Sequence, residues 1–175
     1  GATRMPAAEQ ALASGIGRLG DTLREVRRIS HALRPAMLDD LGLAAALEQL
    51  VRELGEQSGI DIGYTQVAHS GARPLPAPVN TALFRIAQEA LSNIVHHAHA
   101  SRAAVTLDVG AHAVTLSIAD NGCGFDAERT QTDARRGIGL RNMRERLDAL
   151  GGTLTIASQV GHTVVAARVP LRAAA

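Results

Sequence analysis

Residues 76–98 read PAPVNTALFRIAQEALSNIVHHA. Apolar side chains recur every three or four residues along this stretch, which is the period of an amphipathic helix. The apolar face consists of Val79, Leu83, Ile86, Ala87, Ala90, Leu91 and Ile94. Near its edge, Glu89, Asn93 and His97 follow one another at intervals of four residues, so they share one side of the helix. We therefore predict a long helix from about Pro76 to Ala98 that packs on a sheet and presents aligned polar groups.

The segments around this helix alternate between apolar and polar residues, as strands do. Strands are predicted at 60–67, 103–109, 114–119, 153–157 and 163–169. The short turn at residues 110–112 indicates that the second and third of these strands form an antiparallel hairpin. The predicted fold class is α+β, a two-layer sandwich of helices on a mixed, mostly antiparallel five-stranded sheet.

Two further helices and one long loop complete the domain. One helix is predicted to start at a cap formed by Asp39 or Asp40 and to end at the glycines 55 and 59. The other helix carries Leu140, Met143, Leu147 and Leu150 on one face. Residues 126–136 are polar and aperiodic, which is typical of a loop that serves a functional site.

The N-terminal part carries a different pattern. Apolar residues between positions 8 and 34 follow the spacing of a heptad seam, which predicts a long helix that pairs with another helix and stops at Pro35. We divide the chain into an N-terminal helix with its connector, residues 1–38, and a domain over residues 39–172. Residues 1–4 do not resemble a natural start, so we expect a longer parent protein.

Composition excludes several classes of protein. All 18 basic residues are arginines, so the chain lacks the lysine of a P-loop, of a eukaryotic-type protein kinase and of a Schiff-base enzyme. A net charge of +1 gives no field to attract nucleic acid or a membrane surface. The single Cys123, with no secretory leader and no apolar run of membrane-spanning length, favours a cytoplasmic location.

Three short motifs carry the chemistry. The helix motif Glu89-x-x-x-Asn93-x-x-x-His97 offers groups that suit a hydrated Mg²⁺ and a phosphate cleft. Asp120 follows a strand and precedes Gly122 and Gly124, so its carboxylate can accept a hydrogen bond from an exocyclic amine while the backbone approaches a flat ligand. Gly137-Ile138-Gly139-Leu140 opens a helix, where free N–H groups and the helix dipole favour phosphate oxygens.

The order and spacing of these motifs, over roughly residues 40–170, resemble the ATP-binding domain shared by histidine kinases, DNA gyrase, heat-shock chaperones and mismatch-repair ATPases. SHALRP (30–35) and LDDLGL (38–43) are similar to the segment that joins dimerisation helices to the catalytic domain in sensor kinases of the nitrate-sensor type. EALSNIVHHA (89–98) resembles the N box of that group, and RNMRER (141–146) resembles its post-lid helix.

The resemblance implies ATP and Mg²⁺ as ligands. It implies that Asn93 coordinates the metal, that Glu89 orients the metal or assists transfer, and that Asp120 reads adenine. Gly137 and Gly139 would end a mobile lid over the phosphates. The complete set of implied nucleotide-binding residues is Asn93, His96, His97, Asp120, Gly122, Gly124, Arg136, Gly137, Gly139, Leu140 and Thr163.

The sequence departs from the family at two places. The position of His96 is commonly lysine, so we expect a weaker or pH-dependent phosphate contact, or one made by Arg136 instead. Family members carry the phosphate-accepting histidine directly before Asp or Glu, and no histidine here has that neighbour; His31 precedes Ala32. We therefore expect a domain that binds ATP and donates its γ-phosphoryl group but does not phosphorylate itself.

The resemblance also implies partners. These are a response-regulator receiver domain and a second copy in the full-length homodimer, whose parent could be anchored in the inner membrane. Two alternatives stay open: an ATP-hydrolysing clamp with Glu89 as general base, and a non-catalytic nucleotide-binding regulator. Zinc bound by the histidines at 96, 97 and 99 is disfavoured, since no Cys or carboxylate completes a tetrahedral set.

Overall fold

The computed structural model describes residues 35–126 and 138–171. The helices and strands lie close to the predicted segments. In chain order they are α2 (Pro35–Ser58), β1 (Asp61–Ala68), α3 (Ala77–Asn93), the π-helix η1 (Ile94–Ala98), β2 (Arg102–Val109), β3 (Ala113–Asp120), α5 (Ile138–Asp148), β4 (Thr153–Gln159) and β5 (His162–Pro170).

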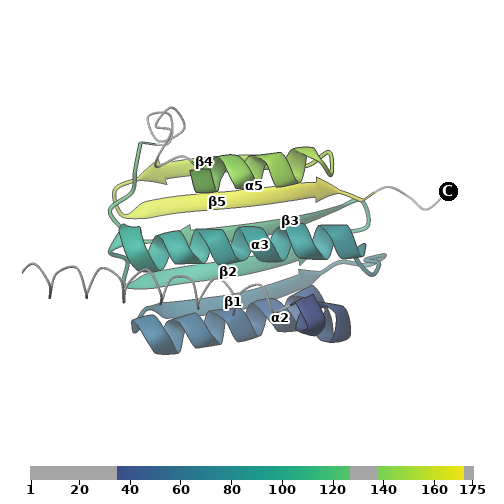
Figure 1. The fold of residues 1–175 in the computed structure, drawn as a ribbon, viewed down its shortest axis with the longest axis horizontal. Coiled ribbons are helices and arrows are strands. Elements are labelled where there is room, and N and C mark those ends of the chain that lie inside the picture. Colours follow the sequence, from purple (N-terminus) through teal and green to yellow (C-terminus); the bar gives the residue numbers. More distant parts are fainter. Residues whose placement is uncertain (1–34, 127–137, 172–175) are drawn as a thin grey trace, which may run out of the picture. The chain divides into compact units, whose positions relative to one another are not determined.

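The five strands form one sheet in the order β1-β2-β3-β5-β4 (Figure 1). Only β1 and β2 run parallel, and the other neighbours are antiparallel. The β2–β3 hairpin closes where Gly110 N–H donates to the carbonyl of Ala113 at 2.9 Å. The register of β3 and β5 places Asp120 opposite Thr163. The predicted mixed, mostly antiparallel five-stranded sheet is therefore confirmed.

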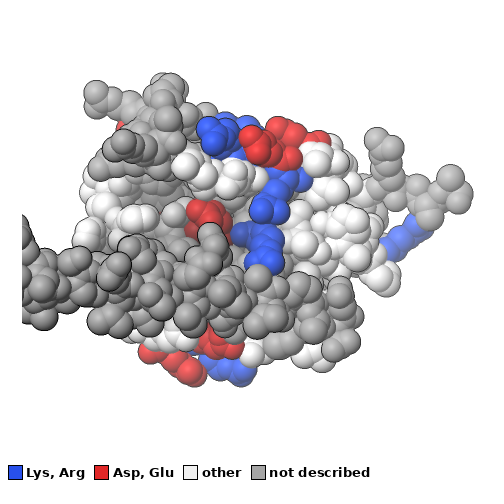
Figure 2. All heavy atoms as spheres, in the orientation of Figure 1, with Lys and Arg blue, Asp and Glu red and all other residues white. Residues whose placement is uncertain are grey.

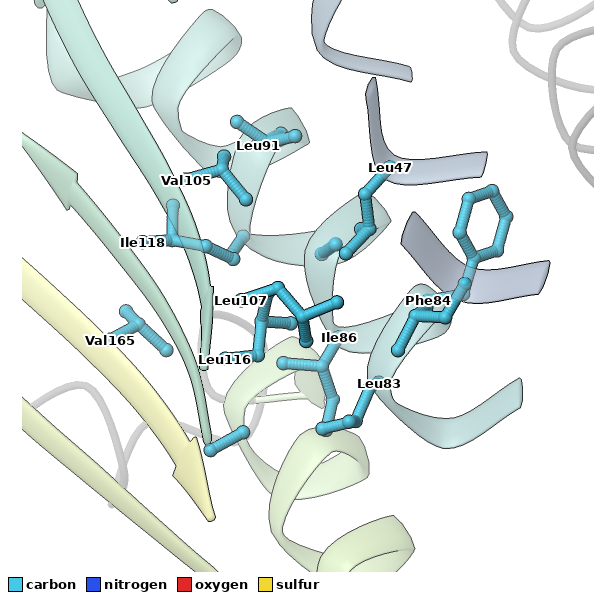
Figure 3. Packing of buried hydrophobic residues seen from close by; sticks show 14 of the residues in the cluster. Leu47, Leu83, Phe84, Ile86, Leu91, Val105, Leu107, Leu116, Ile118 and Val165 are labelled. Atoms are coloured by element: carbon cyan, nitrogen blue, oxygen red, sulfur yellow. The ribbon is translucent and has the colours of Figure 1, made fainter. Parts of the chain in front are cut away.

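The helices α2, α3 and α5 cover one face of this sheet (Figure 1). Alternate residues of β2 and β3 point into the interface, because side chains along a strand alternate between its two faces. Figure 3 shows Leu107 and Leu116 of the hairpin facing Ile86 and Leu83 of α3. The largest fully buried side chains are Leu47, Leu50, Leu83, Ile86, Leu91, Leu107, Leu116, Ile118, Met143 and Leu147.

The start of α2 differs from the prediction. Helical backbone begins at Pro35, a residue that suits a first helical turn because its missing N–H would be unpaired there. Gly42 then interrupts the helix with φ 79° and ψ 172°. The break therefore lies at Gly42 rather than at a cap formed by residues 39 or 40. At the other end, Gly55 stays inside the helix and accepts a hydrogen bond from Gly59 N–H at 2.9 Å.

The end of the long helix also differs. The prediction treated residues 76–98 as one regular helix, but the last five residues, Ile94–Ala98, form a π-helix that ends at His99 in the left-handed conformation (φ 52°). A π-helix has more residues per turn than an α-helix, so the step from Asn93 to His97 does not follow the regular α-helical geometry of the step from Glu89 to Asn93.

Several predictions lie outside the described residues: the heptad helix and most of the connector, His31, and most of the loop with Arg136 and Gly137. The division into residues 1–38 and 39–172 stays a prediction. In the stretches that the structure describes, no helix has both the length and the apolar character needed to cross a bilayer.

Candidate functional site

The candidate site begins at Asp120, the last residue of β3. The residue is 8% exposed, and its Oδ1 atom accepts a hydrogen bond from Gly122 N–H at 2.8 Å. Among the described residues, Oδ2 of the same carboxylate has no hydrogen-bond partner. One carboxylate oxygen therefore holds the turn together, and the other is left to receive a donor from a ligand.

The glycines after Asp120 are required by close backbone packing. A Cβ atom at Gly122 would lie 2.3 Å from the carbonyl oxygen of Ala98. At Gly124, where φ is +67°, a Cβ atom would lie 2.6 Å from the carbonyl oxygen of Gln159. Gly161 N–H also donates to the carbonyl of Gly122 at 2.8 Å. The turn is thus wedged between the end of η1 and the β4–β5 hairpin.

The end of η1 is joined to this turn by hydrogen bonds. Cys123 N–H donates to the carbonyl of Ala98 at 2.8 Å, and the Cys123 thiol lies 3.6 Å from the carbonyl of His97. Residues 97–98 end η1, which continues directly from Asn93 at the end of α3. The helical segment that carries the first motif and the turn after Asp120 are therefore in direct contact.

Glu89 connects the same helix to the start of α5. A Cβ atom on Gly139 would lie 2.1 Å from Oε1 of Glu89 and 3.0 Å from its Cδ. The missing side chain of Gly139 therefore makes room for the Glu89 carboxylate. Helix N-termini favour negative charge, so this is a suitable place for a carboxylate. The α3–η1 unit thus touches both other motifs, at Ala98 and at Glu89.

A chain of hydrogen bonds lies on the other side of Asp120. Thr163, opposite Asp120 in the sheet, is 4% exposed. Its Oγ1 lies 2.9 Å from Oγ of Ser158, which also accepts a hydrogen bond from Phe125 N–H at 2.9 Å. The chain links the side of the candidate site next to Thr163 to the backbone just after Gly124.

The remaining predicted residues occupy different environments. Asn93 is half-buried at the last position of α3, whereas His96 and His97 are exposed, with ring centroids 6.3 Å apart. Leu140 is 5% exposed and belongs to the hydrophobic core, so its side chain is not available to a ligand. Arg136 and Gly137 lie outside the described residues.

Two residues of the site were missed by the sequence analysis. Asn121 accepts hydrogen bonds from the N–H groups of Ser101 and Arg102 at 3.0 and 2.9 Å, and so ties the end of β3 to the start of β2. Ser158 pairs with Thr163 across the β4–β5 hairpin. The hairpin turn between two predicted strands fixes that pairing, so the sequence contained the signal for Ser158.

Charged side chains on the helix-bearing face do not gather by sign. Figure 2 shows acidic and basic side chains interspersed on the visible part of the helix-bearing face. Recognition of a phosphate would therefore rest on local groups.

A cavity of about 310 Å³ lies at the opposite end of the sheet, near Gly42, Asn80 and Val109, and is separate from the candidate site.

Comparisons with known proteins give the family of this domain. Residues 79–173, more than half of the chain, match the family described as histidine kinase-, DNA gyrase B-, and HSP90-like ATPase. Sensor histidine kinase MctS of Rhizobium johnstonii is 43% identical over 157 residues, 89% of this chain and 33% of that protein. Sensor histidine kinase NarS of Mycobacterium tuberculosis is 29% identical over 165 residues, 94% of this chain and 38% of that protein. The chain thus spans about a third of the length of these curated relatives.

Solved structures show the same fold. The blue-light activated histidine kinase EL346 of Erythrobacter litoralis superposes with a TM-score of 0.63 at 20% identity, covering 90% of this chain and 51% of that one. The histidine kinase AdeS of Acinetobacter baumannii gives a TM-score of 0.59 at 15% identity, covering 98% of this chain and 95% of that one. These findings confirm the predicted fold and the predicted kind of ATP-binding domain. The chain belongs to the family of histidine kinase-, DNA gyrase B- and HSP90-like ATPases.

Proposed function

We propose that this domain binds Mg-ATP and donates its γ-phosphoryl group to a histidine on a dimerisation helix of a two-component sensor kinase. The observation that carries the proposal is the contact of one helical unit, α3–η1, with both the Asp120 turn and the start of α5. This contact supports a single site with a purine side at Asp120 and a phosphate side at Asn93. An aspartate of a response-regulator receiver domain would later take the phosphoryl group from the histidine.

Purine recognition is assigned to the end of β3. The free Oδ2 of Asp120 accepts a hydrogen bond from the exocyclic amine of adenine, and burial of the carboxylate strengthens that bond. Gly122 and Gly124 keep the backbone close enough for a flat ring to lie against it. Thr163 supplies a second polar contact, directly or through water.

Metal binding is assigned to the phosphate side. Asn93 offers an amide oxygen, and Glu89, one helical turn earlier, offers a carboxylate; among the described residues, neither side chain makes a hydrogen bond or ion pair. These hard oxygen donors fit Mg²⁺, which takes only one or two protein ligands and fills its shell with phosphate oxygens and water. Mg²⁺ would neutralise charge on the phosphates during transfer.

The acceptor, the dimer and the domain limits are further parts of the proposal. Residues 1–38 are assigned to a dimerisation helix and its connector, and residues 39–172 to the catalytic domain. Since no histidine in this chain precedes Asp or Glu, transfer requires an accepting helix supplied from outside the chain, and this chain alone does not phosphorylate itself. His96, His97 and Arg136 are assigned to the phosphates because their side chains can carry positive charge.

Calorimetry with Mg-ATP on the native chain and on Asp120→Asn tests the proposal. The amide keeps an oxygen for Gly122 N–H but turns an NH₂ group toward the adenine amine, so two donors face each other. A hydrogen bond to a charged group contributes about 1.5–3 kcal/mol, so the affinity should fall roughly 10- to 150-fold. Equal affinities for the two proteins, or no binding of Mg-ATP by the native chain, would contradict it.

One alternative function has a specific observation in its favour. Glu89 lies next to the start of α5, close to the region assigned to phosphate, so it could activate water in an ATP-hydrolysing clamp. Phosphorylation of an added dimerisation helix separates the two functions. Transfer of phosphate by the native chain to a histidine of that helix identifies the kinase, whereas hydrolysis without transfer, lost in Glu89→Ala, identifies the clamp.

A further inference from the structure

We infer that Ser158 is a positioning residue for purine recognition, because it fixes the hydroxyl of Thr163 and ties it to the backbone at Phe125. The inference rests on the proposed function, since it concerns how that site reads its base. The three atoms involved, Phe125 N, Ser158 Oγ and Thr163 Oγ1, form two consecutive contacts of 2.9 Å.

The direction of these hydrogen bonds follows from the groups that take part. Ser158 Oγ accepts from Phe125 N–H, and its own proton has no acceptor among the described residues other than Thr163 Oγ1. A hydroxyl group donates one hydrogen bond and can accept two. When Ser158 donates to Thr163, the proton of Thr163 is released to point elsewhere.

The location of Thr163 decides where that proton goes. Thr163 faces the helices from β5 and lies opposite Asp120, whose Oδ2 is free. A purine that places its amine on Asp120 brings a ring nitrogen, an acceptor, to the same side. Ser158 therefore orders Thr163 as a donor to a ring nitrogen, directly or through one water, while Asp120 acts as the acceptor for the amine. This donor–acceptor pair recognises the edge of adenine.

The simpler explanation is that Ser158 and Thr163 only stabilise a hairpin, as cross-strand hydroxyl pairs do. β4 contains a matched control for this explanation. Thr155 lies on the same strand, is exposed on the outer face, and donates to the carbonyl of Ala166 on β5 at 3.5 Å. Thr155→Ala removes a hydroxyl that bonds to the same neighbouring strand but lies away from the site.

Calorimetry with ADP and with adenosine on the native chain, Ser158→Ala and Thr155→Ala tests the inference. Ser158→Ala should lower the affinity for both ligands by the same factor, about three- to tenfold, which is the range expected for one neutral hydrogen bond. The factor is the same because Thr163, which loses its fixed orientation, contacts the base that both ligands share. Thr155→Ala should leave both affinities unchanged. Ser158→Thr, which keeps a hydroxyl on a β-branched side chain suited to a strand, should restore binding.

A double-mutant cycle isolates the route of the effect. In a Thr163→Val background, which lacks the hydroxyl to be ordered, Ser158→Ala should cause no further loss. Ser158→Cys, a weaker hydrogen-bonding variant of similar size, carries the test if the alanine variant does not fold. The inference is overturned if Ser158→Ala lowers the affinity for ADP but not for adenosine, or if Ser158→Ala and Thr155→Ala have equal affinities. Failure of the native chain to bind either ligand overturns the proposed function instead.

Discussion

Replacement of Gly122 by alanine tests whether the helix that carries Asn93 and the turn that follows Asp120 really share one seam. The backbone at Gly122 lies outside the left-handed region, so alanine is compatible with its conformation. The whole effect is therefore steric. The new Cβ would lie 2.3 Å from the carbonyl oxygen of Ala98 and 2.8 Å from Oδ1 of Asp120. Backbone on both sides of the seam must move.

The movement breaks interactions on either side of the new methyl group. Cys123 N–H leaves the carbonyl of Ala98, and Gly122 N–H leaves Asp120; both hydrogen bonds are 2.8 Å long in the native chain. Losing the two bonds and overpacking a tight contact together cost about 2–5 kcal/mol of unfolding free energy. Displacement of the Asp120 carboxylate should also weaken ADP binding by at least about tenfold.

Gly63→Ala is the matched control. This glycine lies on β1 away from the site, and a Cβ there meets no atom within 4 Å. The substitution should leave the free energy of unfolding unchanged or raise it slightly, because alanine restricts the unfolded chain. Urea unfolding and ADP calorimetry on both variants give the two quantities needed. If Gly122→Ala matches Gly63→Ala in both, the seam between η1 and the turn does not exist as described.

Two further predictions concern Glu89 and Tyr64. Gly139→Ala should displace the Glu89 carboxylate in the native background. In the Glu89→Ala background the same change should stabilise the fold by about 0.5–1 kcal/mol, because alanine favours the helix and no longer clashes. A double-mutant cycle measured by urea unfolding would show no coupling between the two positions if the contact is absent. Burial, and to a lesser degree the charge of Glu48, raises the pKa of Tyr64 to about 12, and its hydroxyl has no partner among the described residues. Because the folded chain holds this proton more tightly than the unfolded chain, stability should be retained up to about pH 10 and fall by at most roughly 2–3 kcal/mol as the pH rises toward 12. Tyr64→Phe should abolish that alkaline loss, and unfolding curves that fall equally in both proteins would contradict the assignment.

The sheet and the long helix could be predicted because their signals are local. Apolar residues alternate with polar ones along β2 and β3 and recur every three or four residues along α3, because one face of each element is buried. The predicted strand ends lie within one or two residues of the observed ends for the same reason. Gly42 shows the limit: a single positive φ breaks a helix without disturbing the apolar spacing on either side of it.

The chemistry of the site was only partly accessible from sequence. Asp120 and its glycines were identified because the other two motifs occur at a compatible spacing; alone, a carboxylate before two glycines is typical of a tight turn. The predicted reason for Gly139 was its free N–H group, but the structure adds a second reason, the carboxylate of Glu89 in the space of its side chain. That contact joins residues fifty positions apart, so no local pattern encodes it.

The π-helix at the end of α3 explains why the helix that carries Asn93 and the turn after Asp120 depend on one another. The last carbonyl groups of a helix have no partner within the helix and must be satisfied elsewhere. Here the carbonyl of Ala98 receives Cys123 N–H, so the turn after Asp120 also completes the helix that carries Glu89 and Asn93. We therefore expect a substitution at this seam to affect both halves of the proposed nucleotide site. It should lower the affinity for adenosine and the rate of phosphoryl transfer together, whereas a change at Glu89 should affect transfer and spare adenosine.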